Sequence, residues 1–249
     1  MSYFSERHSV RSYDNTKAIG KTLIDSIIEQ AMHAPNTGNM QLYSVIVTRS
    51  REGKKALSPA HFNQPAVTSC DTLLTVCLDI RRFCRWCEIS GTTAGFHNFQ
   101  AFVYSLIDAT IFAQQICTIA EMAGLGTCYM GTTTYNAPLI AETLSLPDGV
   151  IPVASLTIGY PASDGNPARR LPLEAIMHED RFHDYTDDDI RRYYAPTEAA
   201  PENAAFIAEN GKENLAQVFA EVRYKASDNE YFSKVYLDYI TTHGFPFPY

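Results

Sequence analysis

The stretch VYSLIDATIFAQQICTIAEMAGLG, residues 103–126, is the longest apolar run in this chain, and it decides which folds the rest of the sequence can adopt. It predicts a helix over about residues 101–123 that is apolar almost all round and that Gly124 ends. The run contains two carboxylates and two amides, namely Asp108, Glu121, Gln114 and Gln115. A membrane span would carry them badly, so we expect a helix buried on all sides, central in the domain or shared with a second subunit.

Shorter patterned runs predict the other elements. TLIDSIIEQAMHA (22–34) predicts an amphipathic helix that begins at a capping box of Thr22 and Asp25 and stops near Pro35. The β-rich runs that predict buried strands are YSVIVT (43–48), TLLTVCLD (72–79) and IPVASLTIGY (151–160). The glycine-bearing GLGTCYMGT (124–132) and the polar PTEAAPENAA (196–205) predict loops.

The chain ends in NEYFSKVYLDYITTHGFPFPY, residues 229–249. This segment predicts an aromatic helix that stops near Gly244, followed by an apolar arm. Because exposed Phe and Tyr side chains are costly in water, we expect the C-terminal helix and arm, about residues 215–249, to pack on the core or on a partner subunit. Residues 1–249 are expected to form a single domain.

Composition narrows the class of protein. The 249 residues are 45% hydrophobic and 19% charged, which is typical of a folded globular protein. The net charge of −8 argues against binding to nucleic acid, which requires a basic surface. The N-terminus MSYFSERHSV has no apolar run of a signal peptide, so we expect a cytoplasmic protein with free thiols and no membrane association.

The cysteines do not predict a metal site. Five of the six lie in or near apolar segments, where cysteine is usually a small hydrophobic residue: Cys70, Cys77, Cys84, Cys117 and Cys128. Cys84 and Cys87 form one CxxC, and no second ligand pair with zinc spacing exists. Chance or packing explains this pair best, and a reactive thiol pair is the alternative.

Four polar segments lie at the edges of predicted elements, where binding groups usually occur: RHSVR (7–11), PNTGN (35–39), YMGT (129–132) and ARRLP (168–172). If the first is extended, Arg7, Ser9 and Arg11 point the same way and face one anion. Guanidinium groups bind phosphate with paired hydrogen bonds. A solvated N-terminal segment is the alternative interpretation.

The other segments are suited to a planar heteroaromatic ring. Asn36, Thr37 and Asn39 offer short donors and acceptors, and Gly131 allows a backbone to approach a flat ring. A plain turn and a helix cap remain alternative interpretations of these two segments. No GxGxxG follows a strand, so the dinucleotide fingerprint is absent. A phosphate with a planar ring describes flavin mononucleotide (FMN) better than a dinucleotide.

Six longer motifs resemble the nitroreductase family of FMN flavoproteins, in particular its oxygen-insensitive, NADPH-preferring subgroup. They are RHSVRSYDNTK (7–17), HAPNTGNMQLYSVIV (33–47), FAQQICTIAEMAGLGTCYMG (112–131), LSLPDGVIPVASLTIGYPA (144–162), RRLPLEAIMHEDRF (169–182) and LDYITTHGF (237–245). The resemblance implies an α+β nitroreductase-like fold with a central, mostly antiparallel sheet flanked by helices. It also implies a long buried central helix and a domain shared across a homodimer.

The resemblance also assigns residues to FMN. The phosphate would be held by Arg7, His8, Ser9, Arg11 and Arg170. The other matched residues are Pro35, Asn36, Thr37 and Asn39 in a loop that reaches the flavin of the other subunit, Gln64 at the pyrimidine edge, and Tyr129, Met130, Gly131 and Thr132 near the ring N5. Ala168 stands where the subgroup usually has a lysine, and Arg169 is expected to compensate. Residues 81–100 are the least family-like part and are candidates for shaping the substrate pocket.

The implied activity is transfer of hydride from NADPH or NADH through FMN to a small-molecule acceptor in a ping-pong cycle. Nitroaromatics, quinones and free flavin are the expected acceptors, and no acid–base side chain is assigned. Arg223 is a candidate for the 2′-phosphate of NADPH, although a surface arginine is the simpler interpretation. Another flavin chemistry, such as that of a dehydrogenase or deiodinase, and a non-catalytic flavin-binding protein are the alternatives.

Overall fold

The computed structural model describes residues 2–246, and its contacts divide the chain into two compact units. The first unit runs from the N-terminus to Asn166 and returns from Phe232 to the C-terminus, while the second is Pro167–Tyr231. The arm beyond Pro246 lies outside the described residues. That the two units act as one domain stays a prediction.

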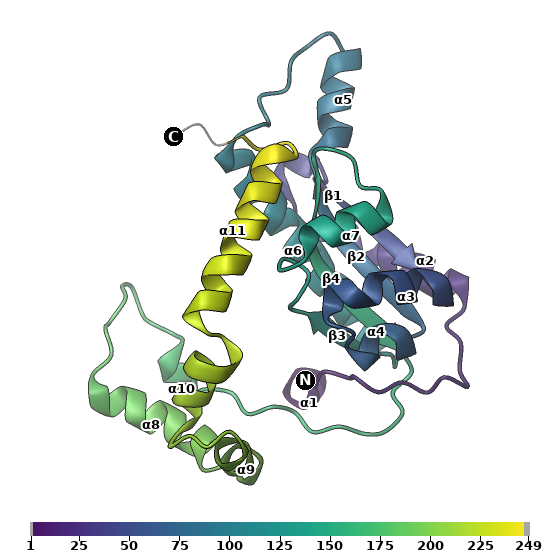
Figure 1. Cartoon of the computed structure of the whole chain (residues 1–249). Coiled ribbons are helices and arrows are strands. Elements are labelled where there is room, and N and C mark those ends of the chain that lie inside the picture. The colour runs from purple at the N-terminus through teal and green to yellow at the C-terminus, as the bar shows by residue number, and fades with distance from the viewer. Residues whose placement is uncertain (1, 247–249) are drawn as a thin grey trace. The chain divides into compact units, whose positions relative to one another are not determined.

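The first unit is built on a four-stranded antiparallel sheet (Figure 1). Its strands are β1 (Tyr43–Thr48), β2 (Thr72–Asp79), β3 (Gly126–Met130) and β4 (Val150–Gly159), in the order β1-β2-β4-β3. β1 pairs with β2 from Tyr43 opposite Leu78 to Thr48 opposite Leu73. The predicted strands at 43–48, 72–79 and 151–160 are confirmed, the last with a shift of one residue.

The segment that follows the long helix was predicted as a loop, and this is wrong. Residues Gly126–Met130 form β3, which pairs with β4 from Gly126 opposite Gly159 to Met130 opposite Ser155. Only Gly124 forms the turn: its φ is 81°, and Leu125 N–H donates to the Ala120 carbonyl at 3.0 Å. These features are typical of a Schellman helix end. The chain therefore passes directly from a helix into an edge strand.

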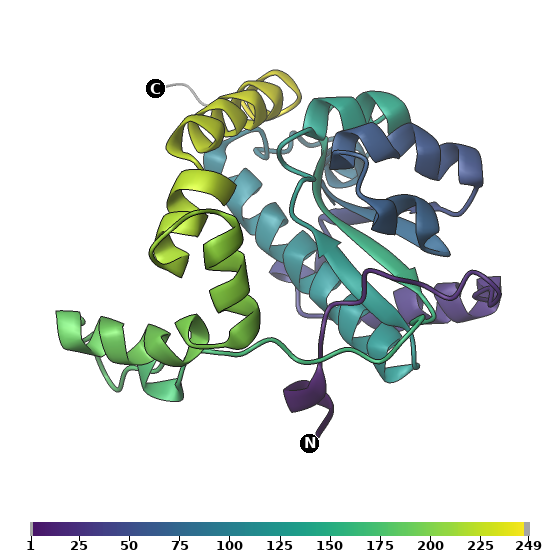
Figure 2. The same ribbon diagram turned by 60° about the horizontal axis from the view of Figure 1, so that its bottom comes forward.

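Helices cover both faces of the sheet (Figures 1 and 2). One face is packed by α2 (Lys21–Ala31) and α6 (Phe99–Met122), and the other by α3 (Arg51–Leu57), α4 (Pro65–Ser69) and α7 (Ala137–Leu144). The remaining described helices of this unit are α1 (Ser2–Glu6), η1 (Thr37–Asn39), η2 (Ser58–His61), α5 (Arg81–Ile89) and most of α11 (Ala226–Thr242).

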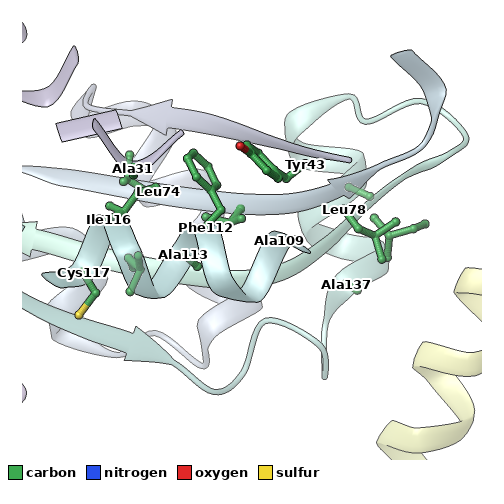
Figure 3. Packing of buried hydrophobic residues seen from close by; sticks show 14 of the residues in the cluster. Ala31, Tyr43, Leu74, Leu78, Ala109, Phe112, Ala113, Ile116, Cys117 and Ala137 are labelled. Carbon is green, nitrogen blue, oxygen red and sulfur yellow. The ribbon is translucent and has the colours of Figure 1, made fainter. Parts of the chain in front are cut away.

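The long helix α6 supplies the centre of the core. Phe112 stacks on Tyr43 with 4.2 Å between ring centroids, and Ala109, Ala113 and Ile116 are fully buried (Figure 3). α6 is long and apolar enough to cross a membrane by length and composition alone. Ten of its residues, however, are buried within the unit, as expected for a core helix.

This helix was predicted to be buried on all sides, within the domain or against a second subunit, and the single chain leaves part of its surface exposed. Four large apolar side chains of α6 are exposed: Phe99 (61%), Ile107 (51%), Ile111 (38%) and Met122 (70%). Phe99, Ile107 and Ile111 recur at multiples of four residues, so they share one face of the helix. We call Phe99, Ile107, Ile111 and Met122 the exposed stripe of α6.

The start of α2 differs from the prediction, and the end of α11 agrees with it. α2 begins after Gly20 without a side-chain cap, and Asp25 pairs instead with Lys21, so the predicted capping box of Thr22 and Asp25 is wrong. α11 ends at Thr242, before Gly244 with φ of 126°, as predicted. Phe245 then inserts fully into the core, so the described start of the arm packs on its own chain.

The second unit is helical where a loop was predicted. Its described elements are η3 (Leu173–Ala175), α8 (Asp187–Glu198), α9 (Pro201–Glu209), α10 (Leu215–Val218) and a π-helical turn, η4 (Phe219–Arg223). The predicted loop at 196–205 belongs to α8 and α9. Pro201 starts α9, and a proline at this position lacks only an N–H that would have had no partner in the helix.

Candidate functional site

The N-terminal segment that carries Arg7 and Arg11 lies along the edge of the sheet. Val10 N–H donates to the Thr127 carbonyl at 2.9 Å, and the Tyr13 hydroxyl contacts Thr157 Oγ1 at 2.6 Å. A Cβ added to Gly126 would lie 2.6 Å from Val10, so only glycine allows this approach. The close packing fixes residues 7–13 against β3 and β4.

Arg7 and Arg11 both influence the ionisation of the Cys128 thiol. Burial raises the pKa of Cys128, and the charges of Arg11 and then Arg7 oppose that shift. Arg7 also borders a hollow of about 260 Å³, together with His8 and Gly126. The convergence of Arg7 and Arg11 on one anion stays a prediction.

Glu121, a residue that the sequence did not assign to the site, restrains Arg7. Its Oε1 lies 3.0 Å from Arg7 Nη2, and it also accepts hydrogen bonds from the Tyr3 hydroxyl at 2.9 Å and from Thr127. Burial alone would lower the pKa of Arg7, but the carboxylate of Glu121 more than offsets this and the net pKa is raised. Arg11 has no carboxylate partner among residues 2–246. Its guanidinium can therefore pair with the anionic group of a ligand without first breaking an ion pair.

His8 and Ser9 complete the segment. His8 Nδ1 lies 3.2 Å from the Glu6 carbonyl oxygen, and the imidazole sits where a Cβ on Gly165 would be, 2.3 Å from His8 Cδ2. Ser9 is half-buried. Both residues therefore stay beside the two arginines.

The 129–132 segment ends β3 next to this segment. Met130 is buried, Tyr129 is partly exposed, and burial raises the pKa of its hydroxyl. Gly131 is exposed, and apart from its two chain neighbours no described residue has an atom within 4 Å of the place where its Cβ would be. A flat ligand can therefore approach the Gly131 backbone without meeting a side chain.

His61 connects the 129–132 segment to Gln64. Its Nδ1 lies 2.8 Å from Thr132 Oγ1, while the nearby Asn136 side chain donates to the Ala60 carbonyl at 2.8 Å. His61 is fully buried, and its Nε2 has no hydrogen-bond partner within residues 2–246. Gln64, three residues later, is half-buried. The sequence assigned no site role to His61, and its position just before FNQPAV (62–67), which contains Gln64, was the available signal.

Burial lowers the pKa of His61 from 6.5 to about 4, which predicts a pH-dependent stability. Below pH 6.5 the unfolded chain takes up a proton that the folded chain does not, so stability falls from pH 6.5 down to about 4 and then levels off. The loss is up to about 3 kcal/mol, at 1.36 kcal/mol for each pKa unit. Urea unfolding at pH 4.5 and 7 would measure it.

The pH dependence of stability in the wild type is compared with that in two variants. His61→Gln removes the titrating group and should flatten this part of the pH dependence, whereas His33→Gln changes an exposed histidine and should leave it intact. Equal pH dependence in wild type and His61→Gln would show that His61 does not titrate in this range.

The 35–39 loop is held separately, by α6. Asp108 is buried, and its carboxylate accepts from Thr37 N–H at 2.9 and 3.1 Å and from Thr37 Oγ1 at 2.9 Å. Asn36 Oδ1 accepts from Gln41 N–H at 3.1 Å. Pro35 and Asn39 are exposed. Asn36 and Thr37 therefore shape the loop, and Pro35 and Asn39 are presented outward.

The remaining candidates lie in the second unit. Arg169 and Arg170 are exposed, and Arg170 Nη1 donates to the carbonyl oxygens of Ala168 and Arg169 at 3.0 and 3.2 Å. The guanidinium of Arg223 lies 4.9 Å from the centre of the Phe206 ring. The meeting of Arg170 with Arg11 stays a prediction, as does the 2′-phosphate role of Arg223.

The cysteines are all free thiols. Cys84 is buried on α5, and burial raises its pKa, so little of it is the reactive thiolate near neutral pH. Cys87 is half-buried on the same helix. These features favour packing over reactivity for the CxxC.

Two of the four predicted segments, residues 7–11 and 129–132, therefore meet around β3, and the region of Gln64 joins them. Val10 joins residues 7–11 to Thr127, and the contact between His61 and Thr132 joins Gln64 to the 129–132 segment. Arg11 supplies a cation without an acid partner among the described residues, and Gly131 supplies open backbone. An anionic group joined to a flat ring fits this donor set.

Comparison with known proteins agrees with this geometry. A sequence model described as "Nitroreductase family" matches residues 4–77 and 89–160, more than half of the chain. An "FMN reductase (NADPH)" of Bacillus subtilis (strain 168) is 33% identical over 182 residues, which cover 72% of this chain and 73% of that protein.

Two solved structures extend the likeness over nearly the whole chain. A protein of Bacteroides fragilis NCTC 9343, provisionally assigned to the oxidoreductases, is 46% identical with a TM-score of 0.97, covering 98% of this chain and 99% of that one. The NfrA1 nitroreductase from B. subtilis is 27% identical with a TM-score of 0.85, over 98% of both chains. The chain described here belongs to the nitroreductase family.

Proposed function

We propose that this chain is an NAD(P)H-dependent FMN oxidoreductase that reduces small-molecule acceptors, with nitroaromatics, quinones and free flavin as the acceptor classes. Flavin-dependent NAD(P)H oxidoreduction is supported by family membership and by the relative named as an NADPH-dependent FMN reductase. The acceptor classes are our proposal, because the relatives do not specify them. The ping-pong order, in which the nicotinamide leaves before the acceptor binds, is also our proposal. The six free thiols agree with the reducing cytoplasm that we propose as its location.

One observation carries the proposal: the segment that contains Arg11 is hydrogen-bonded to β3 through Val10, and the open backbone of Gly131 directly follows the end of the same short strand, Gly126–Met130. When bound, FMN would supply a ring that accepts hydride and passes on electrons. Arg11, with Arg7 held by Glu121, would bind its phosphate. Gly131, Gln64 and Thr132 would lie along the ring, with His61 holding Thr132 in place.

The remaining assigned residues take their proposed roles from the family. His8 and Ser9 would add contacts at the phosphate, with Arg169 and Arg170 completing it from the second unit. Tyr129 and Met130 would border the ring. Pro35, Asn36, Thr37 and Asn39 would reach the flavin of a partner subunit.

A homodimer is part of the proposal. The exposed stripe of α6 presents four large apolar side chains to water in the single chain, and a second copy of the same helix face would cover them. The 35–39 loop is held on the same helix by Asp108, so dimerisation through α6 would carry it toward the partner. The stripe and the loop thus support one arrangement.

Anaerobic reduction tests the proposal. The protein loaded with FMN should lose its yellow colour when NADPH or NADH is added, and a nitroaromatic or a quinone should restore the colour. Failure to take up FMN would overturn the proposal. A yellow protein that neither nucleotide bleaches would instead be a flavin-binding protein, and one that bleaches but is not reoxidised by these acceptors would have another flavin chemistry.

A further inference from the structure

The loop at residues 36–41 holds an unfavourable backbone conformation. Asn39 and Gln41 have φ angles of 55° and 52°, in the left-handed region where a Cβ crowds the backbone, and Gly38, which has no Cβ, has a φ of 56°. The loop also borders a hollow of about 380 Å³, lined by Met40, Gln41 and Phe112 among others. Hydrogen bonds from neighbouring helices therefore contribute to holding its shape.

Those hydrogen bonds reach the loop from two helices. Asp108 on α6 holds its start through Thr37, as described above. Arg82 on α5 holds its end, because its Nη2 donates to the carbonyl oxygens of Gln41 and of Tyr43, the latter at 3.2 Å. The two anchors fix opposite ends of the strained residues.

Arg82 is itself fixed by the carboxylate that ends β2. Asp79 Oδ2 lies 3.3 Å from Arg82 Nη1, and Asp79 Oδ1 accepts from the Arg82 backbone N–H at 3.1 Å. Nη1 also lies 3.3 Å from Ser44 Oγ, which donates to Asp79 at 2.5 Å. Both terminal nitrogens of Arg82 are therefore occupied by protein acceptors. Such a group is poorly placed to bind a ligand anion and well placed to hold backbone.

This arrangement belongs to a part of the chain outside the family match. Asp79 and Arg82 fall within residues 78–88, between the two stretches that match the nitroreductase family. We propose that Arg82, oriented by Asp79, is a positioning residue that fixes the 36–41 loop in its cofactor-binding shape. The inference rests on the proposed function, which assigns this loop to the flavin.

The test compares two arginines of α5. Arg82→Ala removes the hold on Gln41 and Tyr43, whereas Arg85→Ala removes an exposed arginine that pairs with Glu88 on its own helix, at 2.7 Å. Hydrogen exchange is measured on the flavin-free protein, at the amides of Gln41 and Tyr43. FMN affinity is then measured by quenching of flavin fluorescence.

Arg82→Ala should speed exchange at the two loop amides about tenfold, leave the β2 amides protected, and weaken FMN binding about tenfold, the size expected for one lost hydrogen bond from a charged donor. Arg82→Lys should restore part of both effects, because lysine keeps the charge but not the planar fork. Arg85→Ala should change neither quantity.

Two results would overturn the inference on its own. One is loop exchange in Arg82→Ala that matches Arg85→Ala. The other is faster loop exchange with unchanged FMN affinity, because the loop shape would then not serve the cofactor. Wild-type protein that binds no FMN would instead overturn the proposed function, and with it the cofactor role of the loop, whatever the exchange rates show.

Discussion

Replacing Arg11 by alanine is expected to weaken FMN binding roughly 10- to 150-fold while leaving the fold intact. Arg11 is exposed and lacks a carboxylate partner among the described residues, so its removal leaves no buried acid unpaired. A hydrogen bond to a charged group contributes about 1.5–3 kcal/mol, and about 1.4 kcal/mol corresponds to tenfold in affinity. Titration of the flavin-free protein with FMN, followed by fluorescence, measures the change.

Arg51→Ala is the control for this prediction. Arg51 is also an exposed arginine of the first unit, at the start of α3, so its loss changes the net charge by the same amount. It should leave FMN affinity unchanged, and Arg11→Lys should lie between wild type and Arg11→Ala. An Arg11→Ala protein that binds FMN with wild-type affinity would place the phosphate elsewhere.

The double variant Ile107→Glu, Ile111→Glu is expected to dissociate the proposed homodimer and to release FMN with it. The two side chains are 51% and 38% exposed in the single chain, so a partner would bury about half of each. Burying half of an isoleucine side chain stabilises the dimer by about 1 kcal/mol. The two positions occur twice in a dimer, which makes four such side chains. The dimer dissociation constant should therefore rise on the order of 1000-fold. Sedimentation at equal protein concentration would report half the mass.

Leu139→Glu is the matched control for the double variant. Leu139 is 39% exposed on α7, on the other side of the sheet from α6, so the same kind of substitution should leave the mass and the bound flavin unchanged. A double variant that stays dimeric would show that the subunits meet elsewhere. A wild-type monomer with full flavin content would contradict the proposed dimer itself.

The strands could be predicted closely because each is a continuous apolar run that ends at polar or turn-forming residues. β2 is buried along its whole length, and its sequence TLLTVCLD (72–79) is the run that predicted the strand. β3 was missed because its glycine, Gly126, resembles a loop residue in sequence. The reason for that glycine is the approach of Val10, which lies 116 positions earlier.

The residues that hold the site could not be predicted for a related reason. The contact between His61 and Thr132 and that between Asp108 and Thr37 each join positions 71 apart in sequence, and the pair of Arg7 and Glu121 spans 114. No local pattern specifies such contacts. Asp108 and Glu121 did have a local signal, since a carboxylate in an apolar helix needs a partner, but the sequence does not say which one.

The attachment of the N-terminal segment to β3 and β4 has a consequence for synthesis on the ribosome. Tyr13 emerges early, yet Thr157, which it contacts, is made 144 residues later. Until β4 has left the exit tunnel, the edge of the sheet against which residues 7–13 pack is incomplete. The anion-binding segment is therefore among the first parts of the chain to be translated, but it can take its place only after β4 (Val150–Gly159) has been made, which leaves cofactor capture to a chain that is well past its midpoint.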